Sequence, residues 1–479
     1  MPQPAVPPLP LRHPAASVRP GLPAAVWLQV AMLACLIGGT LGHVLLPVQL
    51  AAALAVMWMI TQLRLMIPLA RVFMALATTL AVIAVALDPA SFARIETALL
   101  QGTGFAALMM VLGLLRDPVR RSSVARGATE YLLSFPPARR FASLFAGAHF
   151  MSLMFNVGII AMIGDLTAAR DGRDTRADPD RRAMVMAAMR GAALVSIWSP
   201  ISLGFAIVTA GLPALDPVTL ALAAFGFGAL AVTLGCLWPM LPAEARVAPP
   251  PATTATTAPA TGQGPWPMLG ILAISALLLA ATYAVHRTAE LSFTVASVTV
   301  LPVFALGWLA LESPRATEGF GPRLTRALGA LADLRSEGAV FLSANVIGAV
   351  LSMALQATPL WQGLMASDAA GLPLALACLL AVPLAATVYL PNTIVVVMGA
   401  QLLGHTPLGL AHPVSLGLAL CIGWGLAICV SPISAMNLIS ARFCATSARR
   451  IALGWNRRYV VVLAALGCAA VALAYGAGL

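Results

Sequence analysis

Runs of apolar residues long enough to cross a membrane recur along almost the whole chain. A helix needs about 20 such residues to span the ~30 Å of hydrocarbon in a bilayer, and several runs here reach about 18 or more without a charge. Only 9% of the 479 residues are charged, 60% are hydrophobic and the mean hydropathy is +0.92. The sequence therefore predicts an all-α polytopic membrane protein with about 11 transmembrane helices.

The charges are few and nearly all the basic ones lie between the apolar runs. The net charge is +11, and all 28 basic residues are Arg. Arg in short loops marks the cytoplasmic side of a membrane, so this charge does not predict nucleic-acid binding. The seven Cys are scattered and form no metal-binding pattern. We expect no cofactor, and the Arg-only composition suggests a bacterial protein of the inner membrane.

Placing the Arg-rich loops in the cytoplasm orders the chain into two halves. We expect a cytoplasmic tail at 1–22, an extra first helix at 23–44, and an extracytoplasmic C-terminus. A Pro-, Ala- and Thr-rich linker at 239–265 separates a first half, 45–238, from a second half, 266–479.

Two apolar segments do not fit a simple crossing. Segment 141–166 has basic loops on both sides, whereas the flanks of segment 371–404 contain no Arg. Each segment is therefore predicted to enter and leave on one side, as a re-entrant hairpin, and the two hairpins enter from opposite faces. The alternative, a full crossing by 141–166, would place five Arg outside.

The tetrapeptide Ser-Pro-Ile-Ser occurs at 199–202 and again 232 residues later at 431–434. A Pro inside a helix removes one backbone hydrogen bond and breaks or kinks the helix. We therefore expect broken helices at 190–212 and 414–441. An Asn in each hairpin precedes each tetrapeptide, Asn156 by 43 residues and Asn392 by 39. Two such halves running in opposite directions predict an inverted-topology repeat with a substrate site near the midplane.

The chemistry of broken helices suits small ions. New helix N-termini offer N–H groups to an anion, while loosened carbonyls with Asn and Ser oxygens suit a small cation such as Na⁺. The predicted site residues are Asn156, Val157, Gly158, Ser199, Pro200, Ser202, Asn392, Thr393, Ser431, Pro432 and Ser434. Asp165 is either a proton carrier or the start of a charged loop. Arg190 either faces an anion or anchors its helix at the cytoplasmic side.

This arrangement resembles the ion transporter superfamily, and most closely its divalent-anion/sodium symporter branch. The matching residues are Asn392-Thr393 at the second tip, Asn156 at the first, and Ser199-Pro200 and Ser431-Pro432 at the breaks. The resemblance implies one Na⁺ site at Asn156 with Ser199, a second at Asn392 with Ser431, and substrate between the tips. It also implies a homodimer in which the hairpin-bearing domain moves as an elevator against a fixed scaffold.

We therefore expect a secondary active transporter, not an enzyme, that moves a small anionic, carboxylate-like solute with Na⁺ or H⁺. A cation/proton antiporter or a metabolite exporter of the same superfamily is the alternative. A polytopic membrane enzyme is a third class, but the few acidic residues outside the membrane pair with no His in a recognisable motif.

Overall fold

The computed structural model describes residues 24–115, 118, 122–171, 178–245, 264–312, 319–367 and 370–479. Within these ranges all regular structure is helical, and eleven helical segments are long and apolar enough to cross a membrane. The predicted all-α polytopic fold is thereby confirmed. The proposed tail, 1–22, and most of the proposed linker lie outside the described residues.

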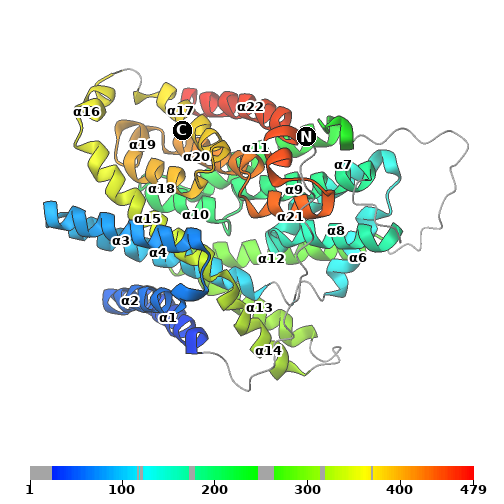
Figure 1. The fold of residues 1–479 in the computed structure, drawn as a ribbon, viewed down its shortest axis with the longest axis horizontal. Helices are drawn as coiled ribbons and strands as arrows, with labels where there is room; N and C mark the ends of the chain where they lie inside the picture. Colours follow the sequence, from blue (N-terminus) through cyan, green and yellow to red (C-terminus); the bar gives the residue numbers. More distant parts are fainter. Residues whose placement is uncertain are drawn as a thin grey trace, which may run out of the picture.

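The chain consists of long helices and of shorter helices that are joined in pairs by a turn (Figure 1). The helices of the first half are α1 (Ala24–Leu41), α2 (Leu45–Gln62), α3 (Pro68–Leu87), α4 (Ser91–Leu114), α6 (Ser123–Leu133), α7 (Pro137–Phe155), α8 (Gly158–Asp171), α9 (Pro179–Trp198), α10 (Leu203–Gly211) and α11 (Pro217–Leu237). Those of the second half are α12 (Trp266–Thr288), α13 (Phe293–Glu312), α14 (Phe320–Gly329), α15 (Arg335–Gln356), α16 (Pro359–Met365), α17 (Leu372–Thr387), α18 (Asn392–Leu403), α19 (Pro407–Ala411), α20 (Pro413–Val430), α21 (Ala435–Cys444) and α22 (Arg457–Gly476).

Both Ser-Pro-Ile-Ser segments interrupt a helix. The backbone turns extended at Ser199 (ψ 124°), and α10 restarts because the Ser202 hydroxyl accepts a hydrogen bond from the Phe205 N–H. Ser431 (ψ 116°) and Ser434 repeat this between α20 and α21, where Ser434 accepts from the N–H of Asn437.

The first broken helix begins earlier than expected, at Pro179 instead of residue 190. Asp178 caps it by accepting from the Asp180 N–H at 3.0 Å, and Pro179 occupies the first turn. Arg181 is thus a buried residue of this helix and not part of the basic loop that follows segment 141–166.

Each predicted hairpin segment is a pair of helices joined by a tight turn. Helices α7 and α8 meet at Asn156 and Val157, and α17 and α18 meet at 388–391. Asn156 has φ 48° and ψ −127°, a strained backbone conformation outside the left-handed helical region. Helices α8, α17 and α18 have 14, 16 and 12 residues, fewer than the ~20 that span a bilayer. A re-entrant course for both pairs stays a prediction.

The two hairpins and the two broken helices form one packed unit. Helix α7 packs on α9 and α17 on α20, while α8 contacts α21 and α10 contacts α18. At the centre α9 crosses α20, where a Cβ added to Gly425 would lie 3.5 Å from the Ala193 carbonyl oxygen. Each half thus contacts the hairpin of the other through the second part of its broken helix.

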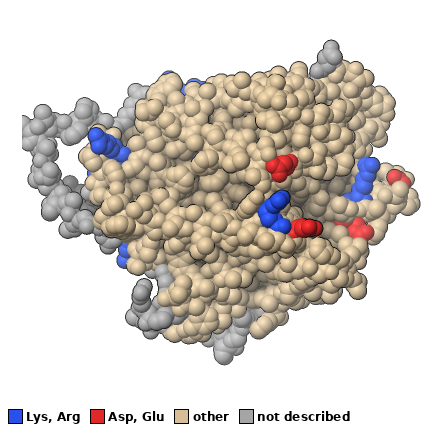
Figure 2. All heavy atoms as spheres, turned by 180° about the vertical axis from the view of Figure 1, so that it is seen from behind, with Lys and Arg blue, Asp and Glu red and all other residues tan. Residues whose placement is uncertain are grey.

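A second group of helices lies beside this unit. Helix α15 packs on α3 and α4, and α13 packs on α4, with α1 and α2 paired at the edge (Figure 1). Large apolar side chains are exposed on these helices, with Leu46 72% and Leu87 82% exposed. Figure 2 shows a face that is almost wholly uncharged, with some of its few charged side chains around a hollow and others at the left edge. Such a surface suits lipid.

Candidate functional site

The tip of the first hairpin presents an amide without a partner. Asn156 is exposed, Val157 and Gly158 are half-buried, and a Cβ added to Gly158 would meet no atom within 4 Å. Within the described part of the chain, the Asn156 side chain makes no hydrogen bond, although its backbone N–H bonds to the Ser152 carbonyl at 2.8 Å. The tip is therefore open and its amide is available.

Helix α7 holds this tip beside the first break. Its N-terminal end is tied to α9 by an Arg140–Asp180 ion pair at 2.8 Å. Further along, buried His149 accepts from the Trp198 indole N–H at its Nε2 (3.0 Å) and lies 3.1 Å from the Gly191 carbonyl oxygen through its Nδ1. Both contacts are satisfied by the neutral Nδ1–H tautomer. The two helices therefore run in the same direction, and Asn156 and Ser199 lie toward the same end.

The first break contains a buried hydroxyl without a partner. Ser199 is 1% exposed, and its Oγ makes no hydrogen bond to any described residue. Ser202 Oγ instead donates to the Ser196 carbonyl at 2.9 Å. Because Pro200 has no N–H, the helix lacks a donor at this point as well. A buried polar atom left unpaired costs about 1–3 kcal/mol unless something binds it.

The second tip and the second break are arranged differently. Asn392 is half-buried at the first turn of α18, and its side chain bonds to no described residue, while Thr393 is buried. In the second break, however, the Asn437 amide Nδ2 donates to the carbonyls of Ile428, Cys429 and Ser431 at 3.1, 3.1 and 2.9 Å. The carbonyls loosened by Pro432 are thus already engaged by a side chain.

Sequence reasoning missed Asn437. It follows Ser434 by three residues, a spacing at which a polar side chain can turn back to the preceding break. The corresponding residue of the first half is Phe205, which cannot do this. The two breaks therefore differ chemically, although their tetrapeptides are identical.

We expect Asn437→Ala to lower the free energy of unfolding by about 2 kcal/mol, because three buried carbonyls each lose one donor and keep another. Asn437→Asp should cost more, since a carboxylate would face those carbonyl oxygens. Thermal unfolding in detergent measures both, with Thr233→Ala, an exposed hydroxyl on α11, as the control. Equal stability of the Ala variant and this control would contradict the proposed role.

The Arg190 guanidinium is hydrogen-bonded to groups of the protein itself. It is fully buried and donates to Asn456 Oδ1 (3.0 Å) and to the carbonyls of Pro239 (2.6 Å), Trp455 (3.0 Å) and Met240 (3.5 Å). Asn456 in turn donates to the Cys429 carbonyl at 2.9 Å, which Asn437 also bonds. Arg190 thus clamps α9 to the second break, with its guanidinium bonded to protein groups, and anchoring at the cytoplasmic side stays a prediction.

The predicted site residues do not all come together. Ser199 lies six residues beyond Ala193, and Ser431 six residues beyond Gly425, so each break is about 9 Å along its helix from the crossing point. Helix α21, which follows the second break, packs on α9, and α10, which follows the first break, packs on α20. The two breaks therefore lie on opposite sides of the crossing. Asp165 is an exposed residue within α8, which continues to Asp171, so the prediction that it begins a charged loop is wrong. Its role as a proton carrier stays a prediction.

No family model and no curated protein matches this sequence. Among solved structures, the chain is similar to the YdaH transporter of Alcanivorax borkumensis, whose structure is described as having an unusual topology. The sequences are 17% identical, the match covers 79% of this chain and 87% of that chain, and the TM-score is 0.45. A TM-score of this size does not establish a common fold.

Proposed function

We propose that this protein is a secondary active transporter that moves a small anionic, carboxylate-like solute across a bacterial inner membrane with Na⁺ or H⁺. The observation that carries the proposal is the pairing, in each half, of an unbonded Asn amide at a hairpin tip with an adjacent break in a buried helix. Nine further candidate spans accompany the two broken helices. Unpaired polar groups among apolar helices are typical of ion and solute paths.

An inverted repeat is supported by the packing. The offset of 232 residues that relates the two tetrapeptides also relates Ala193 to Gly425, which meet where α9 crosses α20. The same offset relates Gly191 to Gly423. Gly191 faces the Phe145 carbonyl of the hairpin helix α7, and Gly423 faces the Leu379 carbonyl of the hairpin helix α17. An elevator movement of this unit within a homodimer is what the family resemblance implies, and we include it in the proposal.

The first break fits a coupling cation better than the second. It has the unpartnered Ser199 hydroxyl and the free Asn156 amide nearby, and among the described residues only the Ser202 hydroxyl donates to the carbonyl that Pro200 frees. The second break also holds an unpaired oxygen, Asn437 Oδ1, but more of its carbonyls are engaged. At the second break the Asn437 amide N–H groups already engage the loosened carbonyls. We therefore place the stronger Na⁺ site at Asn156 and Ser199, and the weaker one at Asn392 and Ser431.

Thermal unfolding of the purified protein in NaCl and in choline chloride tests this proposal. A ligand present at about 100 times its dissociation constant stabilises the folded state by about 2.7 kcal/mol. We expect a Na⁺-specific shift in the wild type that Ser199→Ala abolishes and Asn392→Ala reduces. In choline chloride Ser199→Ala should unfold no earlier than the wild type, because the hydroxyl has no protein partner to lose.

Thr233→Ala is the matched control, since it removes an exposed hydroxyl of α11 that bonds only within its own helix. It should keep the full Na⁺ shift. A Na⁺ shift that survives both Ser199→Ala and Asn392→Ala would contradict a cation site at the breaks. No Na⁺ shift in the wild type would favour H⁺ coupling, and Asp165→Asn would then be the variant to compare for transport.

A further inference from the structure

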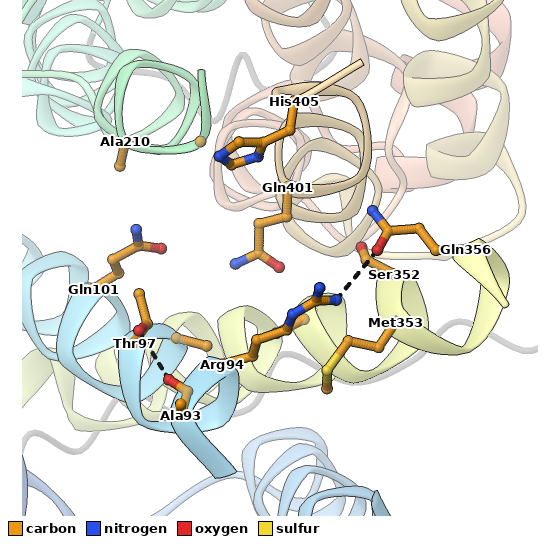
Figure 3. A pocket seen from close by; sticks show the side chains of 13 residues that line it. Ala93, Arg94, Thr97, Gln101, Ala210, Ser352, Met353, Gln356, Gln401 and His405 are labelled. Carbon is orange, nitrogen blue, oxygen red and sulfur yellow. Dashed lines mark hydrogen bonds between the residues drawn. The ribbon is translucent and has the colours of Figure 1, made fainter. Parts of the chain in front are cut away.

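A cleft of about 550 Å³ lies where α4 and α15 meet α10 and α18 (Figure 3). Clefts of about 300–1,000 Å³ are the size that binds small organic molecules. This cleft is away from the hairpin tips, because Gln401 in its wall follows Asn392 by nine residues of α18, about 14 Å along the helix. It also contains none of the residues that the sequence predicted for the site.

One cation dominates the charge of the cleft. Arg94 of α4 lines it, and no Asp or Glu does. Among the described residues Arg94 forms no ion pair, and its one hydrogen bond runs from Nη1 to Gln356 Oε1 at 3.3 Å. The nearest acid along α4, Glu96, is engaged by Gln49 Nε2 at 2.7 Å. Most N–H groups of the Arg94 guanidinium are therefore free to bind an anion.

With the Arg-rich loops placed in the cytoplasm, the predicted topology leaves two Arg on the outer side, Arg94 and Arg287. Arg287 lies near an acidic side chain. Arg287 helps to lower the pKa of Asp216, after the larger effect of the hydrogen bond from the Thr219 hydroxyl. Because Arg is rare on the outer side of membrane proteins, an outer Arg without a counter-charge needs an explanation. Arg94 is an outer Arg without a counter-charge among the described residues, whereas Arg287 has one in Asp216.

Amides, the His405 imidazole, the hydroxyls of Thr97 and Ser352 and several apolar side chains complete the wall. Gln101 and Gln401 point into the cleft from α4 and α18 (Figure 3). Gln401 is held in place because its Nε2 donates to Asn345 Oδ1 at 3.0 Å, and buried Asn345 donates to the Ala98 carbonyl at 2.6 Å. Much of the remaining wall is apolar and consists of Ala93, Ala98, Ala210, Gly211, Ala349 and Met353.

We propose that this cleft binds a monocarboxylate with an apolar body. The Arg94 guanidinium takes the carboxylate through paired N–H groups, the amides of Gln101 and Gln401 surround the polar end, and the alanines and Met353 cover the apolar body. Arg suits this task because its planar fork matches both carboxylate oxygens. The site does not depend on the hairpin tips or on ion coupling. It can therefore be tested independently of the proposed function.

Binding of radiolabelled benzoate to the purified protein tests the proposal, with benzamide and benzylamine as competitors of equal size and different charge. We expect benzoate to bind and Arg94→Gln to weaken it at least 10-fold. Arg287→Gln, the matched outer Arg, should leave it unchanged. Ala210→Met should also abolish binding, because the longer side chain fills the cleft, and an unchanged unfolding temperature would show that both variants are folded.

Four results would overturn this site. One is the absence of benzoate binding to the wild type at about 10 mM, beyond the range of a weak specific site. Another is equal affinity of wild type and Arg94→Gln, and a third is competition by benzylamine as strong as by unlabelled benzoate. The fourth is loss of binding in Asn392→Ala with retention in Arg94→Gln, which would move the ligand to the hairpin tip and leave the proposed transport function intact.

Discussion

Replacing Arg190 by Ala is expected to lower the free energy of unfolding by about 3–5 kcal/mol, because charged hydrogen bonds to buried groups are strong and their loss leaves acceptors unpaired. The guanidinium donates to Asn456 and to three backbone carbonyls, and it lies 4.5 Å from the centre of the Tyr459 ring. No acidic side chain among the described residues pairs with it. Ala would thus expose Asn456 Oδ1 and the carbonyls of Pro239 and Trp455 without a donor.

Unfolding in detergent measures this effect, and two further variants separate charge from geometry. Arg190→Lys keeps the charge but cannot reach all four acceptors, so we expect an intermediate loss of about 1–3 kcal/mol. Arg126→Ala removes an exposed Arg of α6 and should change stability by less than about 0.5 kcal/mol. If Arg190→Ala unfolds like Arg126→Ala, the network does not hold α9 to the second break.

Local sequence patterns predicted the parts of this fold that local physics decides. Apolar length located the spans, and Pro200 and Pro432 located the breaks, since a missing N–H acts on its own helix. The turns at Asn156 and before Asn392 were predicted because the charges that flank these two apolar segments do not fit a simple crossing. Each of these features depends on residues within a few turns of one another.

The features that sequence reasoning missed depend on residues far apart in the chain. Arg190 meets Asn456 across 266 residues, and His149 meets Trp198 across 49. Nothing near Arg190 shows that neutral acceptors will surround it. Asn437 is an intermediate case, because its distance from Ser434 was visible and its role became clear only when the carbonyls it bonds were located.

The cleft beside Arg94 was also beyond local reasoning. Its wall draws on four helices from both halves of the chain, and Arg94 by itself reads as a loop residue at the start of a span. What made it notable was the comparison with Arg287, which requires knowing where the acids lie. A lone charge becomes informative only when its surroundings are known.

Two equivalent glycines should show a graded effect on stability. A Cβ at Gly191 would lie 2.4 Å from the Phe145 carbonyl oxygen and 3.1 Å from the His149 backbone nitrogen, both in α7. A Cβ at Gly423 would lie 3.0 Å from the Leu379 carbonyl oxygen in α17. Backbone atoms cannot move aside as side chains can, so Gly191→Ala must push α7 away from α9. We expect a loss of about 3 kcal/mol for Gly191→Ala and about 1 kcal/mol for Gly423→Ala.

Gly226→Ala provides the control, because this glycine lies inside α11 and a Cβ there meets nothing within 4 Å. Ala favours a helix over Gly by up to about 1 kcal/mol, so this variant should be as stable as the wild type or more so. The order Gly191, Gly423, Gly226 in unfolding temperature would show that close approach of the hairpin helices holds the tips beside the breaks. If Gly191→Ala were as stable as Gly226→Ala, α7 would not lie against α9 as described, and the alignment of Asn156 with Ser199 would lose its basis.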